Sequence, residues 1–152
     1  MNIDRKDIVL RITGRVRKPY EIRMEELHSM QTQEIQDIPV ICGSGTPKGS
    51  IGKFKGVLLG DLIRKADVLN EEHNDTKKMF IAASADDGYK VVFSWQEIFN
   101  TAVGGGVMIV IERDGTVFDG IQHPIELISA EDYFTGARYV KGLRNIELVL
   151  VQ

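Results

Sequence analysis

The sequence predicts an α+β fold in which a mixed, mostly antiparallel β-sheet carries a few short packed helices. Two observations lead to this fold class. Segments with the composition of strands outnumber segments with helical periodicity. Most neighbouring strand segments are also joined by short turns, which favours antiparallel pairing over the long crossovers of a parallel βαβ fold.

The predicted strands are short apolar or alternating segments. In the first of them Ile8, Leu10 and Ile12 share one face. A turn centred on Asp87-Gly88 or on Asp86-Asp87 joins two of the strands, and Asp114-Gly115 forms a turn after another. The expected strands are residues 8–16, 38–42, 79–84, 89–93, 107–112, 125–129 and 139–151.

Three short helices are expected to pack on the sheet. One covers residues 24–30, and a second runs from Val57 to Asp67 because its apolar residues recur at helical spacing. The third begins at Ser94, which with Glu97 matches the capping box. The apolar stripe of the second helix consists of Leu58, Leu59, Leu62, Ile63 and Ala66.

Composition predicts one globular domain over residues 1–152. The 19 Lys and Arg residues against 22 Asp and Glu give a net charge of −3, so composition does not favour nucleic acid as a partner. No apolar run is long enough to span a membrane. No secretory signal is visible, which predicts a cytoplasmic protein, or a periplasmic one if a signal has been removed.

The single cysteine, Cys42, ends a short apolar strand and precedes a segment rich in glycine and lysine. A thiolate is a soft ligand for transition metals, and glycine amides and lysines favour its deprotonated form. Alternatively, Cys42 is a small buried hydrophobic residue at a strand end. The segment from Gly43 to Lys55 is expected to be a loop, either an anion-binding nest or simply solvated chain.

Basic residues cluster near the C-terminus of the chain. Arg138, Lys141 and Arg144 either meet an anionic ligand from one side or keep the last strand soluble. The acidic pair Glu131-Asp132 reads as solvated surface charge or a turn.

The order of four motifs over residues 8–150 resembles the molybdopterin-binding domain of the sulfite oxidase family. No one motif is specific, but all four stand in the order that the family has. They are Leu10-x-Ile12-x-Gly14-x-Val16-x-x-Pro19 leading to Cys42, Phe54-Lys55-Gly56-Val57-x-Leu59-x-Asp61-Leu62-Ile63, Ser84-Ala85-Asp86-Asp87-Gly88-Tyr89 followed by Phe93-Ser94, and His123-Pro124-Ile125-Glu126-Leu127-Ile128 through Arg138-Tyr139-Val140-Lys141.

The resemblance implies a molybdenum–molybdopterin cofactor whose one protein thiolate is Cys42. It implies oxygen-atom transfer on a small anionic or oxo-type substrate, as in sulfite oxidation or sulfoxide reduction, with an electron-transfer protein as partner. Gly43-Ser44-Gly45 would approach the cofactor, and Arg138 and Lys141 are candidates for binding its phosphate or an anionic substrate.

The sequence also departs from the family. Its first strand begins almost at the N-terminus, where family enzymes have a long pterin-holding segment, and Gly43-Ser44-Gly45 replaces the basic residues that follow the cysteine in sulfite oxidases. The alternative function is therefore a cofactor-free binding or interaction module on the same fold. A redox protein that uses Cys42 alone is a third hypothesis, but the chain offers no resolving cysteine.

Overall fold

The computed structural model describes residues 8–41, 45 and 47–152. Its helices are α1 (Met24–Ser29), α2 (Leu59–Lys65), α3 (Trp95–Asn100) and the 3₁₀ helices η2 (Asp75–Lys78) and η3 (Ala102–Gly106). Its strands are β1 (Ile8–Gly14), β2 (Tyr20–Arg23), β3 (Gln33–Ile41), β4 (Pro47–Leu58), β5 (Met79–Ala85), β6 (Lys90–Ser94), β7 (Val107–Arg113), β8 (Thr116–Val117), β9 (Glu126–Ser129), β10 (Val140–Lys141) and β11 (Leu143–Leu150).

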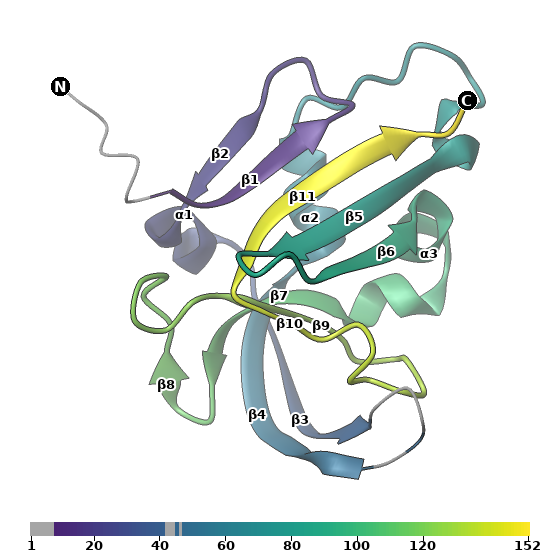
Figure 1. Ribbon diagram of the computed structural model, residues 1–152. Coiled ribbons are helices and arrows are strands. Elements are labelled where there is room, and N and C mark those ends of the chain that lie inside the picture. Colours follow the sequence, from purple (N-terminus) through teal and green to yellow (C-terminus); the bar gives the residue numbers. More distant parts are fainter. Residues whose placement is uncertain (1–7, 42–44, 46) are drawn as a thin grey trace, which may run out of the picture.

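The strands form two sheets (Figure 1). One has the order β2-β1-β11-β5-β6, and the other has the order β10-β9-β7-β4-β3 with β8 added beside β7. Strands β1 and β11 pair in parallel, and every other described pairing is antiparallel. The α+β class with a mixed, mostly antiparallel sheet is confirmed.

One expected strand is divided between the two sheets. The sequence predicts a continuous strand over residues 139–151, but Gly142 adopts a φ of 74° and separates β10 from β11. Glycine takes this left-handed conformation without a steric penalty, so the chain turns there. Strand β10 then pairs with β9 in one sheet, and β11 pairs with β1 and β5 in the other.

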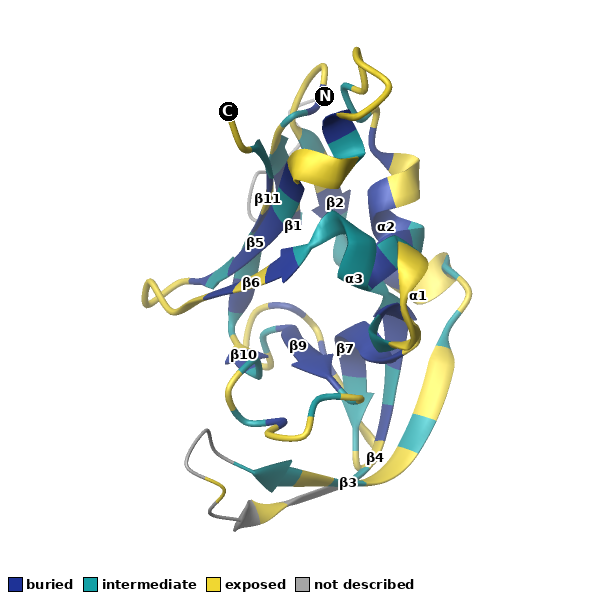
Figure 2. Ribbon diagram, turned by 90° about the vertical axis from the view of Figure 1, so that its right-hand side faces the viewer, coloured by how far each residue is buried: buried dark blue, intermediate teal, exposed yellow. Residues whose placement is uncertain are grey.

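The main hydrophobic core lies on the face of the five-stranded sheet that carries the helices (Figure 2), and it also includes buried residues of β4, β7 and β9 from the other sheet. Of the predicted apolar stripe, helix α2 buries Leu59, Leu62 and Ile63 completely, and Ala66 is buried directly after the helix. The helix begins two residues later than predicted. Val57 and Leu58 belong to β4, where they pair with Ile109 and Met108 of β7.

Local turn and cap signals are confirmed. Ser94 accepts a hydrogen bond from the Glu97 N–H, and the Glu97 carboxylate accepts one from the Ser94 N–H, which completes the capping box. Asp114 and Gly115 both have positive φ and form the two-residue β7–β8 hairpin loop. In the β5–β6 turn, the Gly88 N–H donates to the carbonyl of Ala85, so Asp86-Asp87 is the centre of the turn.

The prediction of a loop over Gly43 to Lys55 is wrong for its described part from residue 47 onward. Strand β4 begins at Pro47 and pairs with β3 on one side and, from Phe54, with β7 on the other. Strand β3 itself starts at Gln33, five residues before the predicted start. The sequence did not predict this first half because its residues are polar and largely exposed at the sheet edge. Pairing between distant segments therefore overrides the local composition of both strands.

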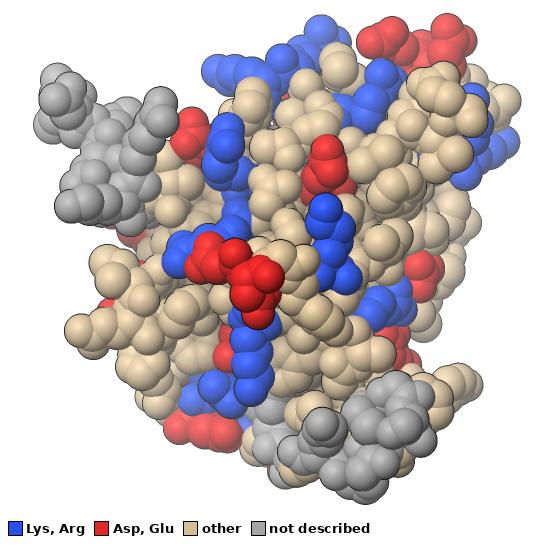
Figure 3. Space-filling view, in the orientation of Figure 1, with Lys and Arg blue, Asp and Glu red and all other residues tan. Residues whose placement is uncertain are grey.

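Charged side chains of both signs are interspersed on the face shown in Figure 3. Several are joined in ion pairs, among them Arg144 with Asp86 at 2.8 Å. Arg144 therefore has a carboxylate partner, and a part for it in an anion site with Arg138 stays a prediction. Within the described ranges, no helix is long and apolar enough to cross a bilayer.

Candidate functional site

The candidate site lies where β3 ends, because the predicted ligand Cys42 directly follows Ile41 in the sequence. Cys42, Gly43 and Ser44 lie outside the described residues, so the predicted thiolate ligand and its approach to a concave pocket stay predictions. Ile41 and Gly45, on the two sides of these residues, are described. Both lie against the loop of residues 130–139, which connects β9 to β10.

The 130–139 loop holds the end of β3 through its backbone. The Ile41 N–H donates to the Thr135 hydroxyl over 3.1 Å, and the Gly136 N–H donates to the Ile41 carbonyl over 2.7 Å. The Thr135 hydroxyl in turn donates to the Pro39 carbonyl over 2.5 Å. Thr135 is 3% exposed, so these contacts are shielded from water. Both polar backbone groups of Ile41 are therefore fixed by this loop.

An aromatic surface adjoins these contacts. Tyr133 is 91% exposed and Phe134 is 47% exposed, and a Cβ placed on Gly45 would lie 3.7 Å from Cε1 of Phe134. The loop, including Arg138, lines a concavity of about 430 Å³ together with Val103. The described residues on both sides of Cys42 thus lie near an open, partly apolar hollow.

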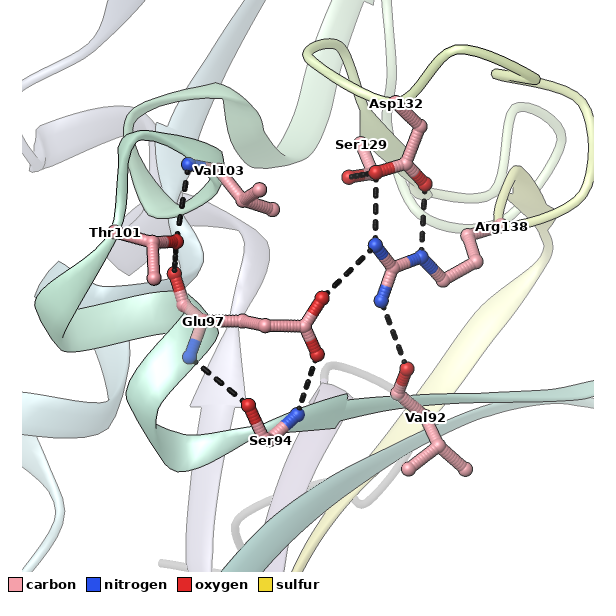
Figure 4. Close-up of polar contacts among 8 residues, drawn as sticks. All are labelled: Val92, Ser94, Glu97, Thr101, Val103, Ser129, Asp132 and Arg138. Carbon is pink, nitrogen blue, oxygen red and sulfur yellow. Dashed lines mark hydrogen bonds and ion pairs between the residues drawn. The ribbon is translucent and has the colours of Figure 1, made fainter.

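Arg138 is the centre of a polar network that anchors the other end of the loop (Figure 4). Its Nε and Nη2 donate to the two carboxylate oxygens of Asp132, each over 2.8 Å, and Nη2 also donates to Glu97 over 3.2 Å. Its Nη1 donates to the Val92 carbonyl over 3.0 Å. The guanidinium carbon lies 4.2 Å from the centre of the Phe93 ring. Arg138 thereby joins the loop to β6 and to the capping box of α3.

This network neutralises the charge that was expected to attract an anion. The hydrogen bonds to Asp132 and the nearby Glu97 raise the pKa of Arg138, although burial acts in the opposite direction. All three guanidinium nitrogens already donate hydrogen bonds. These bonds use four of the five guanidinium N–H groups. A contact between Arg138 and a cofactor phosphate or an anionic substrate stays a prediction, and it would use the second N–H of Nη1 or an exchange of partners.

Lys141, the second predicted anion ligand, is placed differently. It is exposed on β10, its Nζ lies 5.5 Å from the centre of the Tyr139 ring, and it makes no ion pair with a described carboxylate. The Tyr139 hydroxyl donates to the Glu126 carboxylate over 2.5 Å, and Arg113 forms an ion pair with the same carboxylate at 3.4 Å. Burial, followed by this hydrogen bond, raises the pKa of Tyr139 well above its usual value.

Sequence reasoning missed Thr135 and Gly136. For Glu131-Asp132 it offered solvated surface charge or a turn, and the turn is present, because the Asp132 N–H donates to the Ser129 carbonyl. The Asp132 side chain is not simply solvated: its carboxylate binds Arg138 and accepts a hydrogen bond from the Ser129 hydroxyl over 2.9 Å. The available signal was a polar loop with two adjacent aromatic residues between two expected strands. Nothing local in that segment indicates contact with residue 41, which is more than ninety positions away.

The fold and this strand end define a class before any relative is compared: a two-sheet α+β domain whose one cysteine follows an edge strand in the sequence. The residues of β3 are exposed or half-buried, so the prediction of a buried strand before Cys42 is wrong. The chain matches the oxidoreductase molybdopterin-binding domain family over residues 1–151, and it belongs to that family. The resemblance to the sulfite oxidase-type domain is therefore confirmed.

A solved structure has the same fold. The sulfane dehydrogenase SoxCD from Paracoccus pantotrophus superposes with a TM-score of 0.68 at 20% sequence identity. The match covers 97% of this chain and 39% of the SoxCD chain, so this chain spans well under half the length of that protein. No curated protein matches the chain in sequence.

The described residues fit one part of a molybdopterin site. The residue before Cys42, Ile41, is held through both its N–H and its carbonyl, and a fixed neighbouring backbone suits a protein ligand to molybdenum. Among the described residues, no group of three or more His, Cys, Asp or Glu side chains gathers to hold a metal by itself. The phosphate contact fits less well, because Arg138 already neutralises two carboxylates. Lys141 makes no ion pair with a described carboxylate, and its contact with a phosphate or an anionic substrate stays a prediction.

Proposed function

We propose that this chain binds a molybdenum–molybdopterin cofactor and that Cys42 donates the protein thiolate to molybdenum. Membership of the molybdopterin-binding family supports the cofactor. The observation that carries the assignment of Cys42 is the hold on its neighbour: Ile41 is fixed through both its N–H and its carbonyl by the 130–139 loop. A thiolate that must keep one position on a metal needs a backbone that does not move.

When bound, the cofactor supplies oxygen-atom transfer with two electrons passing through the metal, on a small anionic or oxo-type substrate. The chain's own residues then bind and orient. Lys141 would bind a phosphate or an anionic substrate, and it would not have to break an ion pair with a described carboxylate to do so. An electron-transfer protein would take up or supply the two electrons, as the family implies.

The test is the molybdenum and pterin content of protein purified from a host that makes molybdopterin. We expect roughly one molybdenum per chain in the unchanged protein and at least a tenfold lower content in Cys42→Ser, because a hydroxyl is a harder and far less acidic ligand. Lys141→Gln should lower the pterin content, and Lys90→Gln, an exposed lysine on β6, is its matched control. Full molybdenum loading of folded Cys42→Ser would refute the ligand assignment.

The second candidate is a cofactor-free interaction module on the same fold. The ion pairs of Arg138 with Asp132 and Glu97 favour the interaction module, because two carboxylates already neutralise the charge that would bind a phosphate. The same experiment separates the two functions. Protein that contains neither molybdenum nor pterin, from a host in which a known molybdopterin enzyme is fully loaded, would support the interaction module.

A further inference from the structure

Another cavity lies on the helical side of the molecule, where α2, α3 and the segment of residues 66–76 meet. Helices α2 and α3 are neighbours on this side (Figure 2). The cavity has a volume of about 530 Å³, and none of its described lining residues belongs to β3 or to the 130–139 loop. Cavities that bind small molecules have volumes of this order, mostly apolar walls and a few polar groups.

Two aromatic rings of α3 line the cavity. Trp95 and Phe99 are one helical turn apart and therefore project from the same side of the helix. Their ring centroids are 4.3 Å apart, with the ring planes inclined by 35°. Both side chains are only half-buried, whereas Ile98 between them is buried in the core. The half-exposed rings offer a surface on which a planar ligand ring can stack.

The segment of residues 66–76 is held in place by a buried carboxylate. Asp75, which is 3% exposed, accepts hydrogen bonds from the N–H groups of Glu71 and Glu72 over 3.2 and 3.0 Å. It also pairs with Arg15 at 3.2 Å. The Nε of Arg15 is buried without a partner among the described residues, which is an unfavourable arrangement for a polar group. The chain retains this cost where it fixes the segment, and the cavity is therefore preformed.

The cavity lining carries no net charge. It contains one arginine, Arg64, and one aspartate, Asp67, and each forms an ion pair with a residue outside the lining, at 3.0 and 3.1 Å. An anionic or a cationic ligand group would therefore meet no excess of opposite charge. The neutral side chains of Asn70 and Thr76, which also line the cavity, provide hydrogen-bond donors and acceptors.

We propose that this cavity binds a small, uncharged heteroaromatic molecule, whose ring stacks on Trp95 and whose polar edge bonds to Asn70 and Thr76. The aromatic wall favours a planar ring, and the balanced charge of the lining favours an uncharged one. The proposal goes beyond the proposed molybdopterin function. It rests on described residues of the helical side and requires neither the metal nor Cys42.

The experiment is an NMR titration of the isotope-labelled full chain. Trp95 is the chain's one tryptophan, so its indole N–H gives a single signal. The probe is quinoline-3-carboxamide, and quinoline-3-carboxylate and 3-(aminomethyl)quinoline are the anionic and cationic probes of similar shape. We expect the carboxamide to shift the Trp95 signal saturably, with a Kd of about 1 mM or tighter. Both charged probes should bind at least about tenfold more weakly, because their charge must be partly desolvated without a partner.

Two variants locate the binding site. Phe99→Leu removes an aromatic ring from the cavity and should weaken carboxamide binding by about fivefold. Phe134→Leu, the same change in the concavity beside the 130–139 loop, is the matched control and should bind like the unchanged chain. Should Phe99→Leu unfold the chain, Asn70→Phe at an exposed position of the lining tests the same cavity by narrowing it.

Three outcomes would overturn the proposal: no saturable shift of the Trp95 signal with the carboxamide, a charged probe that binds as tightly as the carboxamide, or equal losses in Phe99→Leu and Phe134→Leu. None of these readings depends on the molybdenum or pterin content of the protein. The proposed function and this binding site can therefore fail separately.

Discussion

The five-stranded sheet and the β3–β4 hairpin are stabilised in different ways. The sheet and its helices share one large buried core, to which β1, β5, β11 and α2 all contribute. The hairpin packs against a much smaller cluster that contains Phe54, Met108, Val110, Phe118 and Ile128, and much of β3 is exposed. Apolar burial thus stabilises the first region, whereas the end of β3 depends on a few polar contacts to the 130–139 loop.

Truncation of one buried side chain in each cluster should have the largest effects on the free energy of unfolding. Ile12→Ala, in the large core, should lower the free energy of unfolding by about 4 kcal/mol, because its fully buried site leaves a cavity. Phe54→Ala should cost about 3 kcal/mol and also speed amide exchange in β3 and β4 selectively, since the small cluster holds that hairpin. Urea melts and hydrogen exchange measure the two effects. Uniform loss of protection in Phe54→Ala would show one shared core.

Removal of the guanidinium should have an intermediate effect. Arg138→Met keeps an unbranched apolar side chain, but it removes the guanidinium that lies over the Phe93 ring and leaves Asp132 and Glu97 without their cation. We expect a loss of about 2 kcal/mol in urea melts, because charge-assisted hydrogen bonds to partly buried acids are broken. Arg64→Met, which breaks the exposed pair with Asp61, is the matched control and should change stability by less than about 0.5 kcal/mol. Equal effects of the two variants would contradict a structural role for Arg138.

The smallest expected effect is at the helix cap. Ser94→Ala should destabilise the chain by roughly 1 kcal/mol, because the Glu97 N–H loses its acceptor at the start of α3. Ser29→Ala, at the exposed end of α1, should be nearly neutral. Both values come from urea melts that stay two-state. No loss in Ser94→Ala would mean that Glu97 and Arg138 alone hold this end of the helix.

Features set by neighbouring residues were predictable, and features set by distant contacts were not. The Ser94–Glu97 cap and the Asp114-Gly115 hairpin follow from four or fewer consecutive residues. The early start of β3 does not, because a polar strand forms there only when β4 pairs with it. The link from Thr135 to Ile41 likewise depends on the fold bringing two remote segments together. For the site, the sequence identified Cys42 as the candidate but could not identify what holds it.

The bond from Arg138 to the Val92 carbonyl has a consequence outside the molecule. Strand β6 is an outer strand of its sheet, and an exposed strand with free carbonyls invites pairing with a strand of another molecule. Before a strand of another molecule can pair with the Val92 carbonyl, the Arg138 guanidinium must leave it. That movement would also separate the guanidinium from Asp132 and Glu97. The arginine that the sequence suggested for ligand recognition therefore occupies one of the carbonyls that a strand of another molecule would need along this edge.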